Sequence, residues 1–298
     1  MKKATPRVAA TTALAYAQEA TGVNALLHRL QRLTLWPFVR AVNYHGVPPQ
    51  HAAQFEKQIR WYAERFVGVG VDDLLQLQRG VWPHARPGLL LSFDDGQRSV
   101  YEQALPAIER YGLRAWLLIP PGFVDAAAGE QYAYAQAHSI TCGRTVHGAD
   151  ERVAMSWDEI RDASRRGHVV GSHTYTHHRL PETTPDEVLR HEIVDSKARL
   201  EAQIGGEVPV FCWVGGEEPA YSARAAAAIR AAGYRIGLMT NNQVFRPGGD
   251  LLQVQRSNIE ADWPLPVVRF LLSGFMDVYY APKRRRVAHV TGGSAARK

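Results

Sequence analysis

Short apolar runs alternate with longer helical patterns along most of this 298-residue chain. Seven of these runs have the length of buried strands, and they lie at 41–44, 89–93, 114–119, 168–171, 208–214, 234–239 and 252–255. Helical patterns occur at 101–111, 157–166, 186–204 and 222–232. Because strands that alternate with helices build parallel sheets, the sequence predicts an α/β fold, a distorted (β/α) barrel with about seven parallel strands.

The order of these patterns predicts three parts of the chain. Residues 1–40 are expected to form an N-terminal helical arm, residues 41–281 the barrel domain and residues 282–298 a flexible basic tail. Within the barrel, residues 125–155 show no clear period and predict a long loop or lid.

The N-terminal arm contains an amphipathic helical pattern between residues 22 and 36. It combines an apolar stripe with two flanking arginines, namely Leu26, Leu27, Leu30, Leu33 and Trp36 with Arg29 and Arg32. Such a helix packs on its neighbouring domain or lies on a membrane surface, and its short length favours packing. Thr11 and Thr12 interrupt the only apolar stretch that resembles a signal peptide. We therefore expect a cytoplasmic protein, with peripheral contact at the inner membrane and export left open.

The formal net charge of +6 is concentrated at the C-terminal end. Six basic residues and no acid follow position 282, and they are Lys283, Arg284, Arg285, Arg286, Arg297 and Lys298. The rest of the chain is close to neutral, so it offers no electrostatic case for nucleic-acid binding. The two cysteines, Cys142 and Cys212, have no Cys-x-x-Cys spacing and are not expected to be ligands.

Two adjacent carboxylates, Asp94 and Asp95, follow the run at 89–93 in the sequence Ser-Phe-Asp-Asp-Gly. Two carboxylates at a strand end cannot both ionise cheaply unless a cation lies nearby. Successive side chains diverge there, so one carboxylate can bind the cation while the other faces the water attached to it. Taken alone, an Asp-Asp-Gly tripeptide is more often a simple turn.

Two histidines, His173 and His177, follow the run at 168–171 in the sequence Gly-Ser-His-Thr-Tyr-Thr-His. Imidazoles four residues apart on a helical turn share one face and suit a single ion, whereas His178 should point elsewhere. One aspartate and two histidines provide three ligands and leave a position for water. Zinc is the expected divalent ion, with nickel, cobalt or iron as alternatives.

Both signals fall at the C-terminal ends of predicted strands, the face on which a (β/α) barrel builds its active site. The same rim receives His45 after the first strand and the Gly215-Gly216-Glu217 turn after the run at 208–214. This convergence favours a metal site over chance pairs in a chain with 12 histidines.

Ser-Phe-Asp-Asp-Gly and His-Thr-Tyr-Thr-His resemble the first two motifs of the polysaccharide deacetylase family, also called the NodB-homology family or carbohydrate esterase family four. The resemblance runs from about residue 43 to residue 277. It implies that Asp94 is the general base and that Asp95, His173 and His177 bind the metal. It also implies that the substrate is an N-acetylated glycan or glycolipid.

Two further family motifs depart from the usual pattern. The third motif is usually Tyr-Pro-Tyr-Gly or Arg-Pro-Pro-Tyr-Gly, and the corresponding sequence here is Phe-Cys-Trp-Val-Gly-Gly. The N–H group of Gly215 in this stretch is a candidate oxyanion donor. The stretch contains no arginine that could orient the base. Arg256, at the end of the last strand, either takes that role or is a surface residue. The late Leu-x-His of the fifth motif is missing. Tyr44-His45 is similar to the Tyr-His sequence that circularly permuted members carry on the first strand, which implies that His45 is the general acid.

The resemblance implies hydrolysis of N-acetyl groups, with Asp94 taking a proton from the attacking water and His45 protonating the departing amine. Two alternatives remain. A hydrolase of small cyclic amides would show a closed pocket under residues 125–155, whereas a groove lined by Trp or Tyr would favour a glycan. A non-catalytic carbohydrate binder is suggested by the altered third motif. Nothing in the sequence indicates an oligomeric state.

Overall fold

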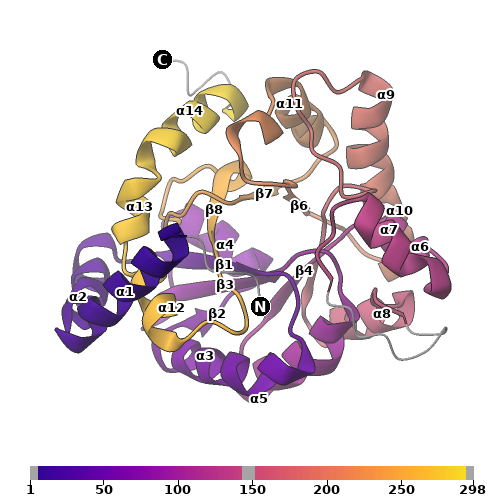
Figure 1. Cartoon of the computed structure of the whole chain (residues 1–298). Coiled ribbons are helices and arrows are strands. Elements are labelled where there is room, and N and C mark those ends of the chain that lie inside the picture. Colours follow the sequence, from indigo (N-terminus) through magenta and orange to yellow (C-terminus); the bar gives the residue numbers. More distant parts are fainter. Residues whose placement is uncertain (1–5, 143–151, 293–298) are drawn as a thin grey trace.

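The computed structural model describes residues 6–142 and 152–292, and it places the strands at the centre with helices around them (Figure 1). The strands are β1 (Val39–Tyr44), β2 (Val67–Gly68), β3 (Gly88–Phe93), β4 (Ala115–Ile119), β5 (Val169–Ser172), β6 (Val210–Cys212), β7 (Ile236–Met239) and β8 (Val254–Asn258). The helices are α1 (Pro6–Ala20), α2 (Val23–Leu35), α3 (Ala52–Arg65), α4 (Val71–Gln78), α5 (Leu105–Arg110), α6 (Pro121–Asp125), α7 (Gln131–Ala137), α8 (Trp157–Arg165), α9 (Asp186–Leu189), α10 (Ser196–Ile204), α11 (Ala223–Ala231), α12 (Leu265–Leu272), α13 (Phe275–Tyr279) and α14 (Ala281–Thr291).

Seven parallel strands close into a barrel in the order β1-β8-β7-β6-β5-β4-β3, with β3 paired back onto β1. This confirms the predicted (β/α) barrel. One edge of β3 pairs with two strands: the two-residue strand β2 pairs with the first residues of β3, and β4 pairs with the last residues of β3. A strand of two residues has no periodicity of its own, which is why the sequence did not reveal it.

Alternate residues of the strands point into the barrel, as the pleat of a strand requires. They form one buried cluster that includes Val39, Ala41, Leu90, Trp116, Leu118, Val210, Cys212, Ile236, Leu238 and Val254. Two residues further along β1, β3 and β8, the inward positions are Asn43, Ser92 and Arg256. The apolar interior therefore ends in a polar layer at the carboxyl ends of the strands.

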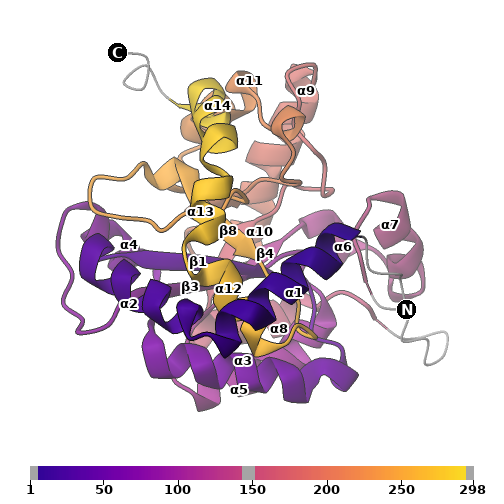
Figure 2. The same ribbon diagram turned by 60° about the vertical axis from the view of Figure 1, so that its left-hand side comes forward.

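The N-terminal arm forms α1 and α2, which lie beside α12 and α13 (Figure 2). The expectation that the apolar stripe of α2 packs inward is wrong. Leu26, Leu30 and Leu33 are exposed, and the residues of α2 that are buried are Asn24 and Gln31. The inward face of α2 meets main-chain carbonyl groups of α12, which select hydrogen-bonding side chains rather than leucines.

The C-terminal segment is more ordered than the sequence suggested. Residues predicted as a flexible tail form most of α14, which buries Val287. The side chains of Lys283 and Arg284 donate hydrogen bonds to main-chain carbonyl groups of the barrel domain, and Arg286 forms an ion pair with Glu218. The remaining part of the predicted tail, residues 293–298, lies outside the described residues.

The segment predicted as a long loop or lid is also partly helical. It contains a 3-10 turn at Ala128–Glu130 followed by α7. Phe123, Ala135 and Ile140 form a small buried cluster with Ala154, which explains how this segment packs without a long amphipathic helix. Residues 143–151 of the predicted lid lie outside the described residues.

Within residues 6–142 and 152–292, no helix combines the length and the hydropathy that a membrane crossing requires.

Candidate metal centre and active site

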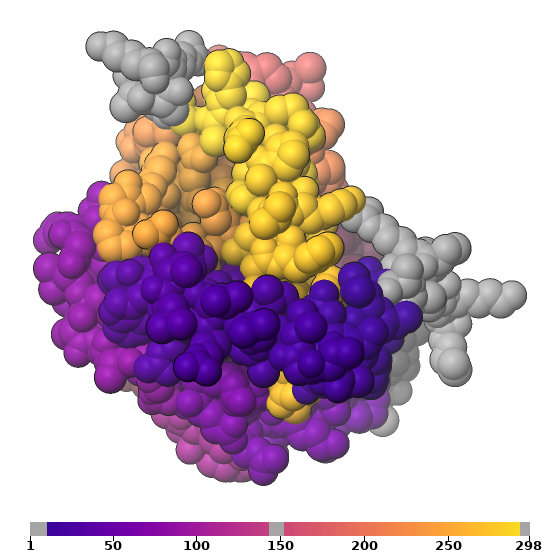
Figure 3. Space-filling view, turned by 90° about the vertical axis from the view of Figure 1, so that its left-hand side faces the viewer, coloured from indigo at the N-terminus to yellow at the C-terminus, as the bar shows by residue number. Residues whose placement is uncertain are grey.

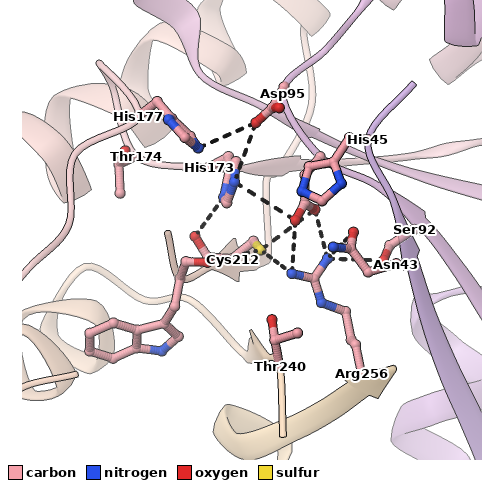
Figure 4. A network of polar contacts seen from close by, with 12 residues as sticks. Asn43, His45, Ser92, Asp95, His173, Thr174, His177, Cys212, Thr240 and Arg256 are labelled. Carbon is pink, nitrogen blue, oxygen red and sulfur yellow. Dashed lines mark hydrogen bonds and ion pairs between the residues drawn. The ribbon is translucent and has the colours of Figure 1, made fainter. Parts of the chain in front are cut away.

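The three residues predicted as metal ligands lie together at the carboxyl ends of β3 and β5 (Figure 4). Oδ1 of Asp95 is 3.7 Å from Nε2 of His173 and 3.3 Å from Nε2 of His177. The three ligand atoms all lie within 4.8 Å of one another. This spacing suits coordination of one cation by all three residues.

The hydrogen bonds of the two imidazoles also fit a cation. Nδ1 of His173 faces the carbonyl oxygen of Cys212 at 3.1 Å, and Nδ1 of His177 faces that of His138 at 2.7 Å. A ring nitrogen that faces a carbonyl carries the proton, so each Nε2 presents its lone pair towards Asp95. Burial lowers the pKa of His173 to about 4, which keeps this ring neutral.

Asp95 completes the case for a cation. Its side chain is buried, and no described residue donates a hydrogen bond to its Oδ1. An unpaired carboxylate oxygen is costly in a buried position unless a positive charge lies beside it. Three converging acceptor atoms without a proton between them form a site that a divalent cation would stabilise.

The two histidines do not share a helical turn, which corrects the sequence interpretation. Ser172 ends β5, and the following residues form an irregular turn in which Thr174 and His177 both have φ of 61°. Five described residues other than glycine have positive φ. Three of the five lie in this site, namely Thr174, His177 and Asp95, whose φ is 73°. Such backbone is unfavourable for a residue with a Cβ atom and persists only where its surroundings hold it.

The buried carboxylate of Glu192 holds this turn in place. It accepts hydrogen bonds from the N–H groups of Tyr175 and Thr176, both at 2.8 Å, and from the Thr176 hydroxyl at 2.6 Å. The hydroxyl of Ser196 donates to the carbonyl oxygen of Thr174 at 3.1 Å. The strained backbone around the histidines is thus fixed from a neighbouring helical segment.

The sequence analysis did not identify Glu192 or Ser196, although a signal was available. Both lie in the predicted helix at 186–204 and share its buried side with Leu189, Ile193 and Leu200. A carboxylate and a hydroxyl on the apolar stripe of a helix need partners, which marks them as candidates. Glu192 also lies in a π-helical stretch, Arg190–Asp195, of the kind often found at functional sites.

Asp94 points into the polar layer of the barrel and pairs with Arg256. Nη1 of Arg256 donates to Oδ1 of Asp94 at 2.6 Å, and Nη2 donates to Oδ2 at 3.0 Å. Nη1 also donates to Oδ1 of Asn43 and to the Ser92 hydroxyl oxygen, each at 3.0 Å. Arg256 is fully buried, so its interpretation as a surface residue is wrong. The two-pronged contact fixes the orientation of the carboxylate.

The same contact sets the charge state of Asp94. Burial alone would raise the pKa of Asp94, but the Arg256 guanidinium outweighs burial and holds that pKa well below its usual range. Burial would likewise lower the pKa of Arg256, and Asp94 raises it instead. Asp94 is therefore ionised at every pH at which the protein is expected to work.

Asp94, His173 and Cys212 form a second group close enough to share an ion. However, Nη2 of Arg256 lies 2.9 Å from Sγ of Cys212 and 3.0 Å from Oδ2 of Asp94. A guanidinium at this distance repels another cation. Burial also raises the pKa of the Cys212 thiol well above its ordinary value, which disfavours the thiolate. The group around Asp95 is the better cation site.

His45 follows β1 and stands on the other side of the centre, half-buried (Figure 4). Its Nδ1 is 3.5 Å from Oε1 of Glu260, a residue that the sequence analysis did not identify. Burial alone would lower the pKa of His45, but Glu260, together with the charges of Asp94 and Asp95, raises it to about 9. An imidazole in this environment is protonated at neutral pH and can act as an acid.

Gly215 lies on the rim of the same centre. A cavity of about 170 Å³ is bordered by His45, Asp94, His173 and His177 together with this glycine. The φ of Gly215 is 82°, a conformation that favours glycine. The structure thus brings all seven predicted site residues to one end of the barrel, while His178 is exposed.

A larger cavity of about 540 Å³ adjoins this centre and shares His45 with it. It is also bordered by His51, Gln97, Glu260 and Trp263. Its volume lies in the range of small-ligand sites. His45 borders both cavities, so the larger one lies next to the candidate centre.

Sequence comparison decides the family. The profile of the polysaccharide deacetylase family matches residues 83–237, which is more than half of the chain. The chain belongs to the polysaccharide deacetylase family. A curated member, the poly-β-1,6-N-acetyl-D-glucosamine N-deacetylase of Escherichia coli K12, is 24% identical over 157 residues, which cover 48% of this chain and 22% of that protein. The match therefore spans less than a quarter of the relative's own length.

Solved structures of deacetylases share the fold of this family member. A de-N-acetylase from Aggregatibacter actinomycetemcomitans superposes with a TM-score of 0.63 at 18% identity, covering 79% of this chain and 100% of that one. A Streptococcus pyogenes deacetylase in complex with acetate gives a TM-score of 0.61 at 17% identity, covering 78% of this chain and 98% of that one. At these identities the likeness concerns the architecture of the deacetylase barrel.

Proposed function

We propose that this polysaccharide deacetylase family member hydrolyses N-acetyl groups of an amino-sugar-containing glycan or glycolipid and releases acetate. The observation that carries the proposal is the convergence of Asp95, His173 and His177 beside Asp94, whose carboxylate is oriented by Arg256. Three ligands with an adjacent, ionised base form the set of groups that metal-assisted amide hydrolysis needs.

Asp95, His173 and His177 would hold one divalent cation, and their mixture of one carboxylate and two imidazoles suits zinc, with nickel, cobalt or iron as alternatives. When bound, such a cation polarises a carbonyl group and increases the acidity of water. The second contacts of His173 and His177, to main-chain carbonyl oxygens, orient both rings for this purpose.

The residues of the chain itself carry the proton transfers. Asp94, kept ionised by Arg256, would accept the proton of the attacking water. The N–H group of Gly215 would face the oxyanion of the tetrahedral species. His45, protonated at neutral pH, would donate a proton to the departing amine, because an amine anion is too poor a leaving group. The position of His45 after β1 supports the circularly permuted arrangement of the family's acid motif.

The adjoining cavity supports a sugar rather than a small cyclic amide as substrate. Half-buried Trp263 borders it, and the apolar face of a pyranose ring can pack on an indole. The activity for which the E. coli relative is named, N-deacetylation of poly-β-1,6-N-acetyl-D-glucosamine, belongs to the same chemical class.

The test measures acetate release from N-acetylglucosamine oligomers together with the metal content of the protein. Wild type should release acetate, lose this activity to a chelator and regain it with zinc. The Asp94→Asn variant should retain the metal and lose most turnover, whereas His173→Ala should lose both. His178→Ala, which changes an exposed neighbouring imidazole, is the matched control and should keep both.

Three outcomes separate the alternatives. Full turnover in Asp94→Asn would reject this residue as the base. Retention of oligomers without acetate release, in a protein that contains metal, would indicate a carbohydrate binder. Release of product from small cyclic amides alone would replace the glycan with the other substrate class.

A further inference from the structure

Helix α2 packs with its polar side against α12. His28 Nε2 contacts the carbonyl oxygen of Arg269 at 2.9 Å, and Gln31 Nε2 donates to that of Leu272 at 3.3 Å. Asn24 is buried on the same side and donates to Glu19. These three positions recur at the spacing of one helix face. The opposite face of α2 is therefore turned to solvent.

That opposite face is apolar. Leu26, Leu30 and Leu33 occupy it at helical spacing, and their exposed fractions are 55%, 45% and 70%. A soluble helix normally has the reverse orientation, with its leucines against the core. The described part of the chain contains nothing that covers these three side chains.

A second short helix, α13, also exposes apolar side chains. Gln31 lies against Gly274, where α13 begins, so α2 and α13 are neighbours on the face drawn in Figure 3. Phe275 and Val278 of α13 are 47% and 76% exposed. Val278 and Leu33 are the two most exposed large apolar side chains of the described residues. We refer to Leu26, Leu30, Leu33, Phe275 and Val278 as the apolar face. Clusters of this kind mark interaction sites.

The exposed charged side chains of α2 itself, Arg29 and Arg32, are positive. No acidic residue occurs between Glu19 and Glu56, whereas Arg29 follows the first leucines of α2 and is exposed. The carboxylates closest in sequence to α2 and within α13 are neutralised, since Glu19 pairs with Arg269 and Asp277 pairs with Arg40. The face thus combines leucines with unneutralised arginine.

This combination of leucines and an arginine indicates which partner binds the apolar face. A second copy of the chain would bring the same positive face against itself, and α2 and α13 offer no unpaired carboxylate among their described residues to receive it. Lipid headgroups with negative charge provide both the anionic partner for Arg29 and an apolar layer for the leucines. Trp36 and Tyr279, exposed at 39% and 56%, are residue types that favour the interface between headgroups and acyl chains.

We propose that α2 and α13 bind the surface of a bilayer that contains anionic lipids, with the leucines of α2 entering the headgroup region. The helices lie in the plane of the interface and do not cross it. This binding is independent of the deacetylase chemistry, because the apolar face contains none of the residues assigned to the metal centre.

The experiment is cosedimentation of the full chain with vesicles of phosphatidylcholine, with and without phosphatidylglycerol. Wild type should bind the anionic vesicles and release them at high salt. The affinity of the Leu26→Gln/Leu30→Gln/Leu33→Gln variant for anionic vesicles should be at least about tenfold lower than that of wild type. Glutamine preserves the helix but removes the apolar side chains. Arg29→Glu should reduce binding to anionic vesicles about fivefold or more.

Two matched controls change the same chemistry on the opposite side of the molecule. Val194→Gln replaces a side chain that is 42% exposed between α9 and α10, and Arg165→Glu reverses an exposed charge on α8. Both should bind vesicles as wild type does. Absence of wild-type binding to anionic vesicles, or equal binding by the triple-leucine variant, would overturn the proposal. A stable dimer in solution that the same triple variant dissociates would assign the face to self-association instead.

Discussion

Replacing Arg256 with methionine tests whether its buried ion pair with Asp94 stabilises the carboxyl end of the barrel, where the candidate site lies. The Arg256→Met variant leaves the Asp94 carboxylate, whose side chain is 5% exposed, without the two hydrogen bonds of 2.6 and 3.0 Å. Removing one partner of a buried pair typically costs about 3–5 kcal/mol, because the other charge remains buried and uncompensated. A loss of about 4 kcal/mol corresponds to roughly a thousandfold change in the unfolding equilibrium.

The pH dependence of this loss distinguishes electrostatics from packing. In wild type the folded-state pKa of Asp94 is lowered, so its stabilising contribution is present above the unfolded pKa, about 4, and is lost as pH falls towards the folded value. Without Arg256, burial raises the pKa of Asp94 above its unfolded value. The contribution of Asp94 is then complete below about pH 4 and is lost as pH rises through the folded pKa. The stability deficit of the variant should therefore grow from acidic to neutral pH.

The assay is urea unfolding at several pH values, followed by fluorescence, with a chelator present so that cation binding does not contribute. Arg40→Met is the matched control. Arg40 is also fully buried, but it makes one hydrogen bond of 2.7 Å to Asp277, which is 14% exposed. Its replacement should cost less, about 1–3 kcal/mol, and should leave turnover unchanged.

A double variant completes the test. Asp94→Asn removes the buried charge, so Asp94→Asn/Arg256→Met should be more stable than Arg256→Met at neutral pH by about 2 kcal/mol or more. If the two substitutions destabilise additively, or if the deficit of Arg256→Met is the same at every pH, the electrostatic reasoning is wrong. Arg256 would then contribute to the barrel only as a packed side chain.

Two further predictions concern residues that contact the proposed acid or position the proposed metal ligands. Glu260 raises the pKa of His45, and the protonated ring is the proposed active form, so activity should fall as pH rises through that pKa. Glu260→Gln should therefore move this alkaline limb of the kcat/KM profile to lower pH. Asp262→Asn, in the same cavity, is its control, and an unmoved limb would remove Glu260 from the account. Glu192→Gln should weaken zinc affinity by about 10-fold to 100-fold in a chelator competition titration, because it loosens the turn that carries two ligands. Exposed Glu187→Gln should bind zinc as wild type does, and equal affinities for both variants would exclude a positioning role.

Local sequence patterns predicted most of the secondary structure. Seven strands were predicted from runs of apolar residues, and the ends of the barrel strands lie within three residues of the ends of those runs. The helical pattern predicted at 222–232 begins at Ser222, which is the N-cap of α11 and whose hydroxyl accepts a hydrogen bond from the N–H of Ala225. Such features depend on neighbours along the chain, so the sequence contains the information directly. The candidate metal ligands were predicted in the same way, since Asp95 and the two histidines directly follow predicted strands, and the structure places the three side chains within reach of one cation.

Other features depended on contacts between distant segments. The amphipathic pattern of α2 predicted a helix correctly but not its orientation, which the carbonyl groups of α12 determine. The role of Glu192 depends on the turn at Tyr175 and Thr176, and the pairing of Arg256 with Asp94 joins β8 to the end of β3.

The amino-acid sequence by itself determined the alternation of elements, the barrel and the residue types of the candidate metal site, because periodicity and short motifs are encoded within a few residues. Only the tertiary structure decided which side of α2 meets solvent, which arginine orients Asp94 and which carboxylate holds the histidine turn. The physical reason is that a polar group selects its partner by distance and burial in the folded chain, and both arise when segments far apart in sequence come together.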